Sequence, residues 1–248
     1  MRFRILSYNI HRAIGVDRRF RPDRIIKILD HYQPDVALLQ EVDVGVPRSR
    51  EIDLAAMLAE ALGYPHYAVG LNVKLRKGHY GNATLSRFPI ERQRNIDLTI
   101  GSRKSRGCLH TTLAVPGKGD DPHLLEVFNL HLGLSFKERP RQVGVLVRAE
   151  EFSSLKGSQP CIVGGDFNDW WTRIAPMFTE VLRFDCATNH KWGYQNAFLT
   201  YPSFSPTGGL DKIFFRGHIR AIKSRCCRLT VSKVASDHLP VISDLELF

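Results

Sequence analysis

The sequence predicts a layered α/β or α+β domain, because short apolar segments typical of strands alternate with amphipathic segments typical of helices along the whole chain. No run of Gly, Ser or Pro divides the 248 residues, and there is no internal repeat. Apolar residues make up 43% of the chain and charged residues 24%, as in ordinary globular proteins, and no apolar run is long enough for a transmembrane helix. We therefore expect one domain over residues 1–248.

The first half of the chain begins with an apolar strand over residues 3–9. Isoleucine and leucine recur at helical spacing behind a proline, which predicts a helix over residues 22–31. A buried strand is expected at 36–39, and an amphipathic helix over 52–62 ends at Gly63. The remaining elements continue the alternation: strands at 66–72, 83–87, 109–115, 124–130, 161–164, 212–215, 219–229 and 241–245, and helices at 137–155 and 173–182.

Charge and cysteine content narrow the partners and the compartment. Lys and Arg number 35 against 25 Asp and Glu, a formal net charge of +10 that favours nucleic acid, phosphorylated small molecules or an anionic membrane, although many basic proteins bind no polyanion. The five cysteines, with Cys226 and Cys227 adjacent, have no CxxC or zinc spacing, so we expect reduced thiols. The N-terminus lacks the pattern of a signal peptide, and we expect a cytoplasmic protein.

Six apolar runs stop abruptly at acidic, amide or imidazole residues, which places these side chains at the rim of a sheet, where ligand sites commonly lie. The residues at these ends are Asn9; Gln40 and Glu41; Asn129 and His131; Asp166, Asn168 and Asp169; Asp211; and Ser236, Asp237 and His238. One such ending is ordinary turn chemistry, but six in one chain indicate a site.

These residue types point to phosphoester hydrolysis. Asn9, Glu41 and Asp166 offer only oxygen atoms, the donors that Mg²⁺ or Mn²⁺ prefers over zinc. His131 and His238 lie near further carboxylates in the sequence, and a carboxylate can orient an imidazole and keep it protonated. A divalent metal, His–Asp pairs and a basic surface together predict a metal-dependent hydrolase of phosphoesters.

The sequence also resembles a known family over its whole length. Seven segments occur in the order typical of the endonuclease/exonuclease/phosphatase superfamily, which includes deoxyribonuclease I: SYNIH, LLQEVD, YGNATLSRFPI, VFNLHLG, VGGDFND, LDKIF and SDHLPV. GDFN together with SDHLP, behind a strand that ends in Asn and a later QE pair, is a specific combination. The resemblance implies a four-layer α/β sandwich, in which two packed mixed β-sheets are flanked by helices and carry the site at one edge.

The resemblance further implies a role for each metal-side and water-side residue. Glu41 would hold the divalent metal with Asn9 beside it, and Asp237 would be a metal-side or orienting carboxylate. Asp166 would orient or deprotonate the attacking water, and Asn168 would steady this water and the phosphate. From the residues alone, Asn9 could also simply cap a strand.

The remaining roles concern the phosphate and its surroundings. By the same resemblance, His238 and His131 would face the scissile phosphate, and Asp211 would be positioned against one of the two histidines. Arg106 could reach a substrate phosphate or be one more surface charge, and we favour the substrate. Asn82 is expected either to support the site, in contact with the substrate, or to form a turn.

Neighbouring polar and aromatic residues have simpler interpretations. Asp169 is expected to be a turn residue, and Gln40 to support the neighbouring Glu41 rather than a metal. Trp170, Trp171 and Trp192 are expected to be core or rim aromatics rather than base-stacking platforms.

The substrate is less defined than the chemistry, because one site architecture serves many phosphoesters. LDKIF and the surrounding segment differ from the patterns of inositol phosphatases and apurinic endonucleases, and the closest resemblance is to small bacterial members without an assigned substrate. Basic loops at 74–77, 103–106 and 137–141 could bind a nucleic-acid backbone or an anionic lipid headgroup. We expect a Mg²⁺-dependent phosphodiesterase, with nucleic acid favoured over phospholipid and no obligate protein partner; a phosphomonoesterase and a catalytically silent polyanion-binding module are the alternatives.

Overall fold

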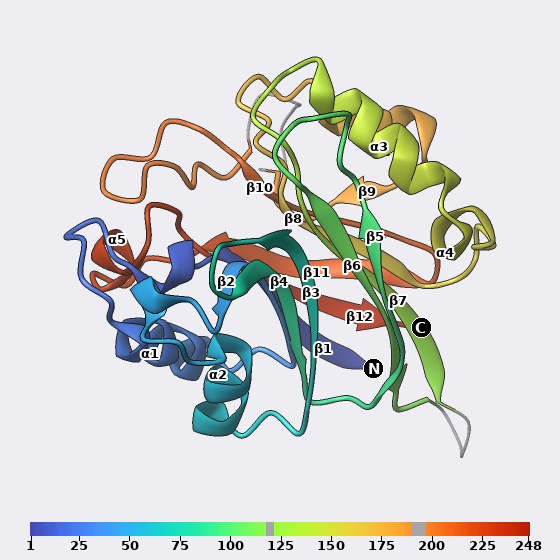
Figure 1. Ribbon diagram of the computed structural model, residues 1–248. Helices are drawn as coiled ribbons and strands as arrows, with labels where there is room; N and C mark the ends of the chain where they lie inside the picture. The colour runs from blue at the N-terminus through green and yellow to red at the C-terminus, as the bar shows by residue number, and fades with distance from the viewer. Residues whose placement is uncertain (118–121, 190–196) are drawn as a thin grey trace.

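Two six-stranded β-sheets pack face to face, and helices cover the outer face of each sheet (Figure 1). This computed structural model describes residues 1–117, 122–189 and 197–248. The arrangement confirms the predicted four-layer α/β sandwich. Among the described residues, no helix has both the length and the apolar character needed to cross a membrane.

The two sheets have similar topologies. The first has the order β11–β12–β1–β2–β4–β3, and the second β5–β6–β7–β8–β10–β9. Each sheet is mixed, because β1 runs parallel to β2, and β7 parallel to β8, among antiparallel neighbours. The strands are β1 (Arg2–Asn9), β2 (Val36–Val44), β3 (His66–Lys74), β4 (His79–Ser86), β5 (Ile90–Asp97), β6 (Gly107–Val115), β7 (His123–His131), β8 (Cys161–Asp166), β9 (Asp185–Cys186), β10 (Asp211–Arg216), β11 (Ile219–Cys226) and β12 (Val241–Leu247).

Three apolar clusters hold the four layers together. The cluster between the sheets includes Ile5, Leu38 and Ile213, each fully buried. A second cluster joins the first sheet to α1 (Pro22–Tyr32) and α2 (Leu54–Leu62), and a third joins the second sheet to α3 (Glu138–Arg148) and α4 (Glu150–Ser153). The other helical turns are η1 (His11–Ala13), η2 (Pro47–Ser49), the π-helical turn η3 (Met177–Val181) and α5 (Ser232–Ala235).

The sheets approach closely where β8 crosses the core. A Cβ on Gly164 would lie 2.6 Å from the Leu38 side chain of the facing sheet, so this position requires glycine. At the next residue, Gly165, the backbone has φ +142°, and a Cβ would lie 2.0 Å from the carbonyl oxygen of Leu130 on the neighbouring strand. The two glycines thus bring the end of β8, and the acidic residue after them, against the facing sheet and against the neighbouring strand β7.

Several predicted elements have different bounds in the structure. Strand β5 was missed because its sequence, IERQRNID, has little apolar periodicity and its side chains are mostly exposed. The helix predicted over 137–155 is interrupted at Ala149, where the backbone is extended, and the helix predicted over 173–182 is reduced to the five-residue η3. The strand predicted over 219–229 ends at Cys226, and the two-residue β9 carried no signal in the sequence.

Candidate active site

The register of the second sheet sets three of the predicted site residues in one row. His131 at the end of β7 is paired with Asp166 at the end of β8, and Asp166 is paired with Asp211 at the start of β10. All three side chains are buried. Residues that lie 35 and 45 positions apart in the sequence therefore meet at one edge of the sheet because three adjacent strands end or begin there.

Asp166 lies at the centre of this row. Its Oδ2 atom accepts a hydrogen bond from Asn9 Nδ2 at 3.0 Å and lies 3.5 Å from His131 Nε2 and 3.7 Å from His238 Nε2. Its Oδ1 atom accepts the backbone N–H of Asn168 at 2.9 Å. Burial raises the pKa of Asp166 to about 6, so the carboxylate is a base matched to neutral pH.

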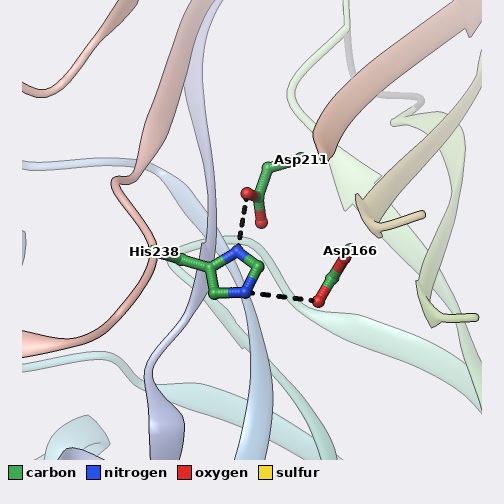
Figure 2. A group of neighbouring side chains, drawn as sticks. All are labelled: Asp166, Asp211 and His238. Carbon is green, nitrogen blue, oxygen red and sulfur yellow. Dashed lines mark hydrogen bonds and ion pairs between the residues drawn. The ribbon is translucent and has the colours of Figure 1, made fainter. Parts of the chain in front are cut away.

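His238 bridges the two aspartates, as Figure 2 shows. Its Nδ1 atom lies 2.8 Å from Asp211 Oδ2, while Nε2 faces Asp166. Burial disfavours the charged imidazolium, but the negative charges of Asp211 and Asp166 outweigh this effect and raise the pKa of His238 to about 10. His238 is therefore a protonated imidazole with one N–H fixed on Asp211 and the other directed into the site.

His131 has the opposite electrostatic environment. Burial lowers the pKa of this imidazole well below its usual range, and the positive charges of Arg106, His238 and Lys104 lower it further. His131 is therefore neutral near pH 7. Its Nε2 atom lies 3.5 Å from Asp166 Oδ2, the same oxygen that His238 faces.

Glu41 belongs to the first sheet, and its position within β2 differs from the strand end that was predicted. Strand β2 does not end at Glu41 but continues to Val44, and its pairing with β4 shifts register between Leu39 and Val42. Glu41 occupies this bulge with φ +56°, a conformation that bulges next to active sites often contain. Its Oε2 atom is buried, receives no hydrogen bond from any described residue, and lies 3.5 Å from Arg12 Nε.

The three residues predicted on the metal side, Asn9, Glu41 and Asp237, all offer oxygen donors. Asn9 is the last residue of β1. Among the hydrogen bonds of the described residues, its Oδ1 atom accepts one, from the backbone N–H of His11 at 3.1 Å. Asp237 is partly exposed, and its Oδ1 atom lies 4.0 Å from His11 Nδ1. The Glu41 oxygen, which receives no hydrogen bond from a described residue, and these amide and carboxylate oxygens are donors of the type that Mg²⁺ or Mn²⁺ prefers. No imidazole nitrogen or thiolate is needed.

A second group could also be considered for a cation. Ligand atoms of Asp166, Asp211 and His238 all lie within 4.8 Å of one another. Burial opposes the charged form of His238, but the charges of both aspartates raise its pKa and keep the imidazole protonated. A protonated imidazole has no free nitrogen lone pair for a metal. The hydrogen bond between His238 and Asp211 and the charge of this trio suit proton transfer.

Asn168 and Ser236 fix the loops that carry the site. Asn168, at φ +50°, donates its side-chain Nδ2 to the Leu132 carbonyl at 2.9 Å, which ties the loop after β8 to the loop after β7. Ser236 donates its hydroxyl to the Asn9 carbonyl at 2.7 Å and accepts the backbone N–H of His238 at 3.2 Å. Sequence reasoning gave Ser236 no role, although its place in the segment SDHLP could have indicated one.

An amide pair, Gln40 and Asn129, joins the two sheets next to Glu41 in the chain. Gln40 donates Nε2 to Asn129 Oδ1 at 2.8 Å, and Asn129 donates Nδ2 to the carbonyls of Leu39 and Ala83 at 3.2 and 2.9 Å. The expected support of Glu41 by Gln40 stays a prediction, because the hydrogen bonds of the Gln40 side chain go to Ser7, Leu38 and Asn129. The part played by Asn129 was missed, because nothing local in the sequence shows which strand of the other sheet it faces.

Asn82 and Arg106 both lie beside His131 and line one small pocket with it. Asn82 is inside β4 rather than in a turn, and its Nδ2 donates to the carbonyls of Gly107 and Asn129 at 3.2 and 2.9 Å. The turn interpretation is therefore wrong, and the amide nitrogen clamps β4 onto the second sheet. Arg106 is 6% exposed, and its Nε atom is buried without a hydrogen bond to any described residue.

The three basic loops differ in how much of their charge is paired within the protein. Lys77 binds the Glu51 carboxylate at 2.5 Å, and Arg139 is buried and donates to the Leu134 carbonyl at 2.7 Å, so part of the charge of two basic loops is paired internally. The third loop, 103–106, contributes the two cations beside His131.

Two of the three tryptophans lie at the rim. Trp170 is 43% exposed and Trp171 77% exposed, so the core alternative is wrong for both. Asp169 accepts the backbone N–H groups of Arg173 and Ile174 at 2.9 and 2.8 Å, which confirms its expected role in the turn. Trp192 lies outside the described residues.

Two packed six-stranded sheets flanked by helices carry an acid–imidazole cluster at one edge, and this defines the layered α/β class of the protein. The family model described as Endonuclease/Exonuclease/phosphatase family matches residues 6–238, and the chain belongs to this family, whose members are hydrolytic enzymes. The chain is 28% identical to the uncharacterized protein YbhP of Escherichia coli K12, with 99% of this chain and 96% of that protein covered.

Solved structures show the same fold at lower sequence identity. The human Nocturnin catalytic domain with a bound sulfate anion is similar with a TM-score of 0.78 and 22% identity, covering 100% of this chain and 95% of that chain. The mannosyl-6-phosphatase Bt3783 of Bacteroides thetaiotaomicron has a TM-score of 0.73 and 18% identity, covering 99% and 100%. These similarities establish the fold.

Proposed function

We propose that this protein is a divalent-metal-dependent phosphodiesterase that acts on nucleic acid. The observation that carries the proposal is the chain of buried contacts from Asp211 through His238 to Asp166. A protonated imidazole and a carboxylate base on one site are the groups that hydrolysis of a phosphoester requires.

The metal site of this proposal comprises Glu41 and Asn9, with Asp237 at its open side. Mg²⁺ is the preferred ion, with Mn²⁺ as a substitute, because the donors are oxygen atoms. When bound, the ion would polarise a phosphate oxygen and neutralise charge that develops in the transition state.

The side chains of the second sheet would perform the proton transfers. Asp166 accepts the proton of the attacking water at Oδ2, the oxygen that also accepts Asn9 Nδ2, while the Asn168 backbone N–H holds Oδ1. His238 donates its Nε2–H to the phosphate, and Asp211 stabilises the resulting charge distribution by holding Nδ1. His131, neutral because of its burial and its cationic neighbours, contacts the phosphate from the opposite side.

Charge supports nucleic acid as the substrate. The net charge is +10, and Arg106 and Lys104 lie against the catalytic edge at His131. A phosphodiester backbone offers several phosphates to such cations, whereas a monoester offers one. The five free thiols support a reducing compartment, and we place the protein in the cytoplasm.

A substrate panel tests the proposal, with Mg²⁺ compared with EDTA and Asp166→Ala as control. The panel contains supercoiled plasmid, abasic and single-stranded DNA, RNA, anionic phospholipid vesicles, bis(p-nitrophenyl) phosphate and p-nitrophenyl phosphate. We expect Mg²⁺-dependent cleavage of nucleic acid and of the model diester, both lost in Asp166→Ala.

Three other outcomes contradict the proposal in different ways. Release of lipid headgroups alone would make the basic loops a membrane-docking face. Cleavage of the monoester alone would make the protein a phosphomonoesterase, the activity in the name of the similar Bacteroides structure. Polyanion binding without turnover, unchanged in Asp166→Ala, would indicate a binding module.

A further inference from the structure

Aromatic rings lead outward from the catalytic imidazole. The Tyr201 ring centroid lies 5.0 Å from that of His238, and the Trp170 ring centroid lies 5.3 Å from that of Tyr201, nearly perpendicular to it at 83°. Trp170 is 43% exposed, so the outer end of this row is open to solvent. A group bonded to the phosphate at His238 would therefore meet an aromatic surface.

The inner ring of this row is fixed to the catalytic loop. Ser203, two residues after Tyr201, donates its backbone N–H to the Asp237 carbonyl and its hydroxyl to the Ser236 carbonyl, both at 2.7 Å. Leu239 donates its backbone N–H to the Thr200 carbonyl at 2.8 Å. The segment that contains Tyr201 is thus bonded to residues on both sides of His238.

The outer ring is held from two directions. The Asp169 carboxylate caps the backbone N–H groups of the turn that follows Trp170. Behind the ring, a Cβ on Gly208 would lie 2.9 Å from the indole, so the absence of a side chain there lets Trp170 lie directly on the backbone. An exposed ring that is already ordered loses little conformational entropy when a ligand packs on it.

We propose that Trp170 and Tyr201 form a subsite that stacks the nucleobase next to the scissile phosphate. This proposal rests on the proposed function, and it names the part of the substrate that the site recognises. It assigns to Trp170 the stacking function that the sequence did not favour. The cations Arg106 and Lys104 lie beside His131 and the rings beside His238, so phosphates and base are received on different sides.

Equilibrium binding tests the subsite without depending on turnover. In the Asp166→Asn background with Mg²⁺, the affinity for a thymidine trinucleotide is compared with that for the same trinucleotide carrying abasic sugars. We expect the base-bearing trinucleotide to bind about tenfold more tightly or better, because one stacked base contributes that much. Trp170→Ala should remove most of this preference, and Trp170→Phe should retain most of it.

Trp171→Ala is the matched control, because it removes an exposed indole from the same loop. We expect the preference for the base-bearing trinucleotide to survive in this variant. Equal affinity for the two trinucleotides, an equal loss on both in Trp170→Ala, or a loss in Trp171→Ala instead would overturn the subsite. So would a Trp170→Ala defect confined to binding of phosphatidylserine vesicles, which would indicate a membrane surface.

The subsite and the proposed function can fail separately. If the wild-type protein cleaves nucleic acid and Trp170→Ala leaves the preference unchanged, the subsite is wrong and the phosphodiesterase stands. If the wild-type protein cleaves no diester and Asp166→Ala changes nothing, the proposed function is wrong whatever the affinity ratio.

Discussion

The two imidazoles of the site, His131 and His238, both face Oδ2 of Asp166, yet their electrostatic environments are opposite. His238 has Asp211 on its far nitrogen and aromatic rings beside it, and the neighbouring negative charges outweigh burial and raise its pKa to about 10. His131 is backed by Arg106 and Lys104, and burial together with these cations lowers its pKa. Two residues of one type, equally buried, thus hold opposite charge states near pH 7.

This difference shows how phosphate binding and proton donation can belong to different residues at one edge of the sheet. The charge on the His238 side belongs to the imidazolium, so that side can donate a proton to the phosphate. On the His131 side the charge belongs to the arginine and lysine behind a neutral ring, so that side attracts phosphate without proton transfer. Substitutions on the two sides should therefore change different kinetic parameters.

The largest effect is expected on the His238 side, from Asp211→Asn. We expect kcat/KM for a diester to fall on the order of 100-fold or more, because the imidazolium loses its charged partner. Loss of the negative charge lowers the pKa of His238 from about 10. Since His238 acts in its protonated form, activity declines as the pH rises through that pKa, and the alkaline limb of the pH–rate profile should move to lower pH.

His131→Asn is the control for this experiment. It should reduce the rate without moving the alkaline limb, because a neutral imidazole contributes no titration there. A matching shift in both variants, or in neither, would contradict the division of charge between the two imidazoles. The acid limb should stay near pH 6 in His131→Asn, since burial raises the pKa of Asp166 to about that value, and it should move to lower pH in Asp211→Asn, because the charge of Asp211 contributes to that rise.

A smaller effect is expected on the cationic side, from Arg106→Ala. We expect KM for single-stranded DNA to rise several-fold and the slope of log affinity against log salt to become shallower by about 0.7, the value for one lost phosphate contact. Arg220→Ala removes the same charge from β11, where Arg220 pairs with Glu246, and should change neither quantity. An unchanged slope in Arg106→Ala would show that Arg106 does not contact a substrate phosphate.

The smallest effect on activity is expected from Asn82→Ala, next to Arg106. Its amide nitrogen holds two buried backbone carbonyls, so we expect the free energy of unfolding in chemical denaturation to fall by about 2 kcal/mol while KM changes little. Asn95→Ala, at an exposed position of β5, should cost less than about 0.5 kcal/mol. A raised KM at unchanged stability would instead support direct substrate contact by Asn82.

The sequence predicted most of the site, because strand ends are marked locally. Asn9, His131 and Asp166 end apolar strands as expected, and Asp211 begins one. Glu41 was predicted for the wrong reason, since a bulge inside β2 rather than the end of the strand directs it to the site. A bulge depends on pairing with another strand, and pairing is not visible in one segment of sequence.

Elements without an apolar pattern were the ones the sequence did not predict. Strand β5 is an edge strand with mostly exposed side chains, and its place is fixed by its pairing with β6. The breaks after Arg148 and within 173–182 likewise depend on how these segments cover the second sheet, which local spacing does not encode.

The sequence by itself determined the chemical content of the site: which carboxylates, amides and imidazoles are present, and that they follow strands. The tertiary structure decided which of them meet and what charge each holds. Register across β7, β8 and β10 joins His131, Asp166 and Asp211, and the loop before β12 brings in His238. Charge states follow from burial and from neighbours distant in sequence, so they exist only once the sheets have packed.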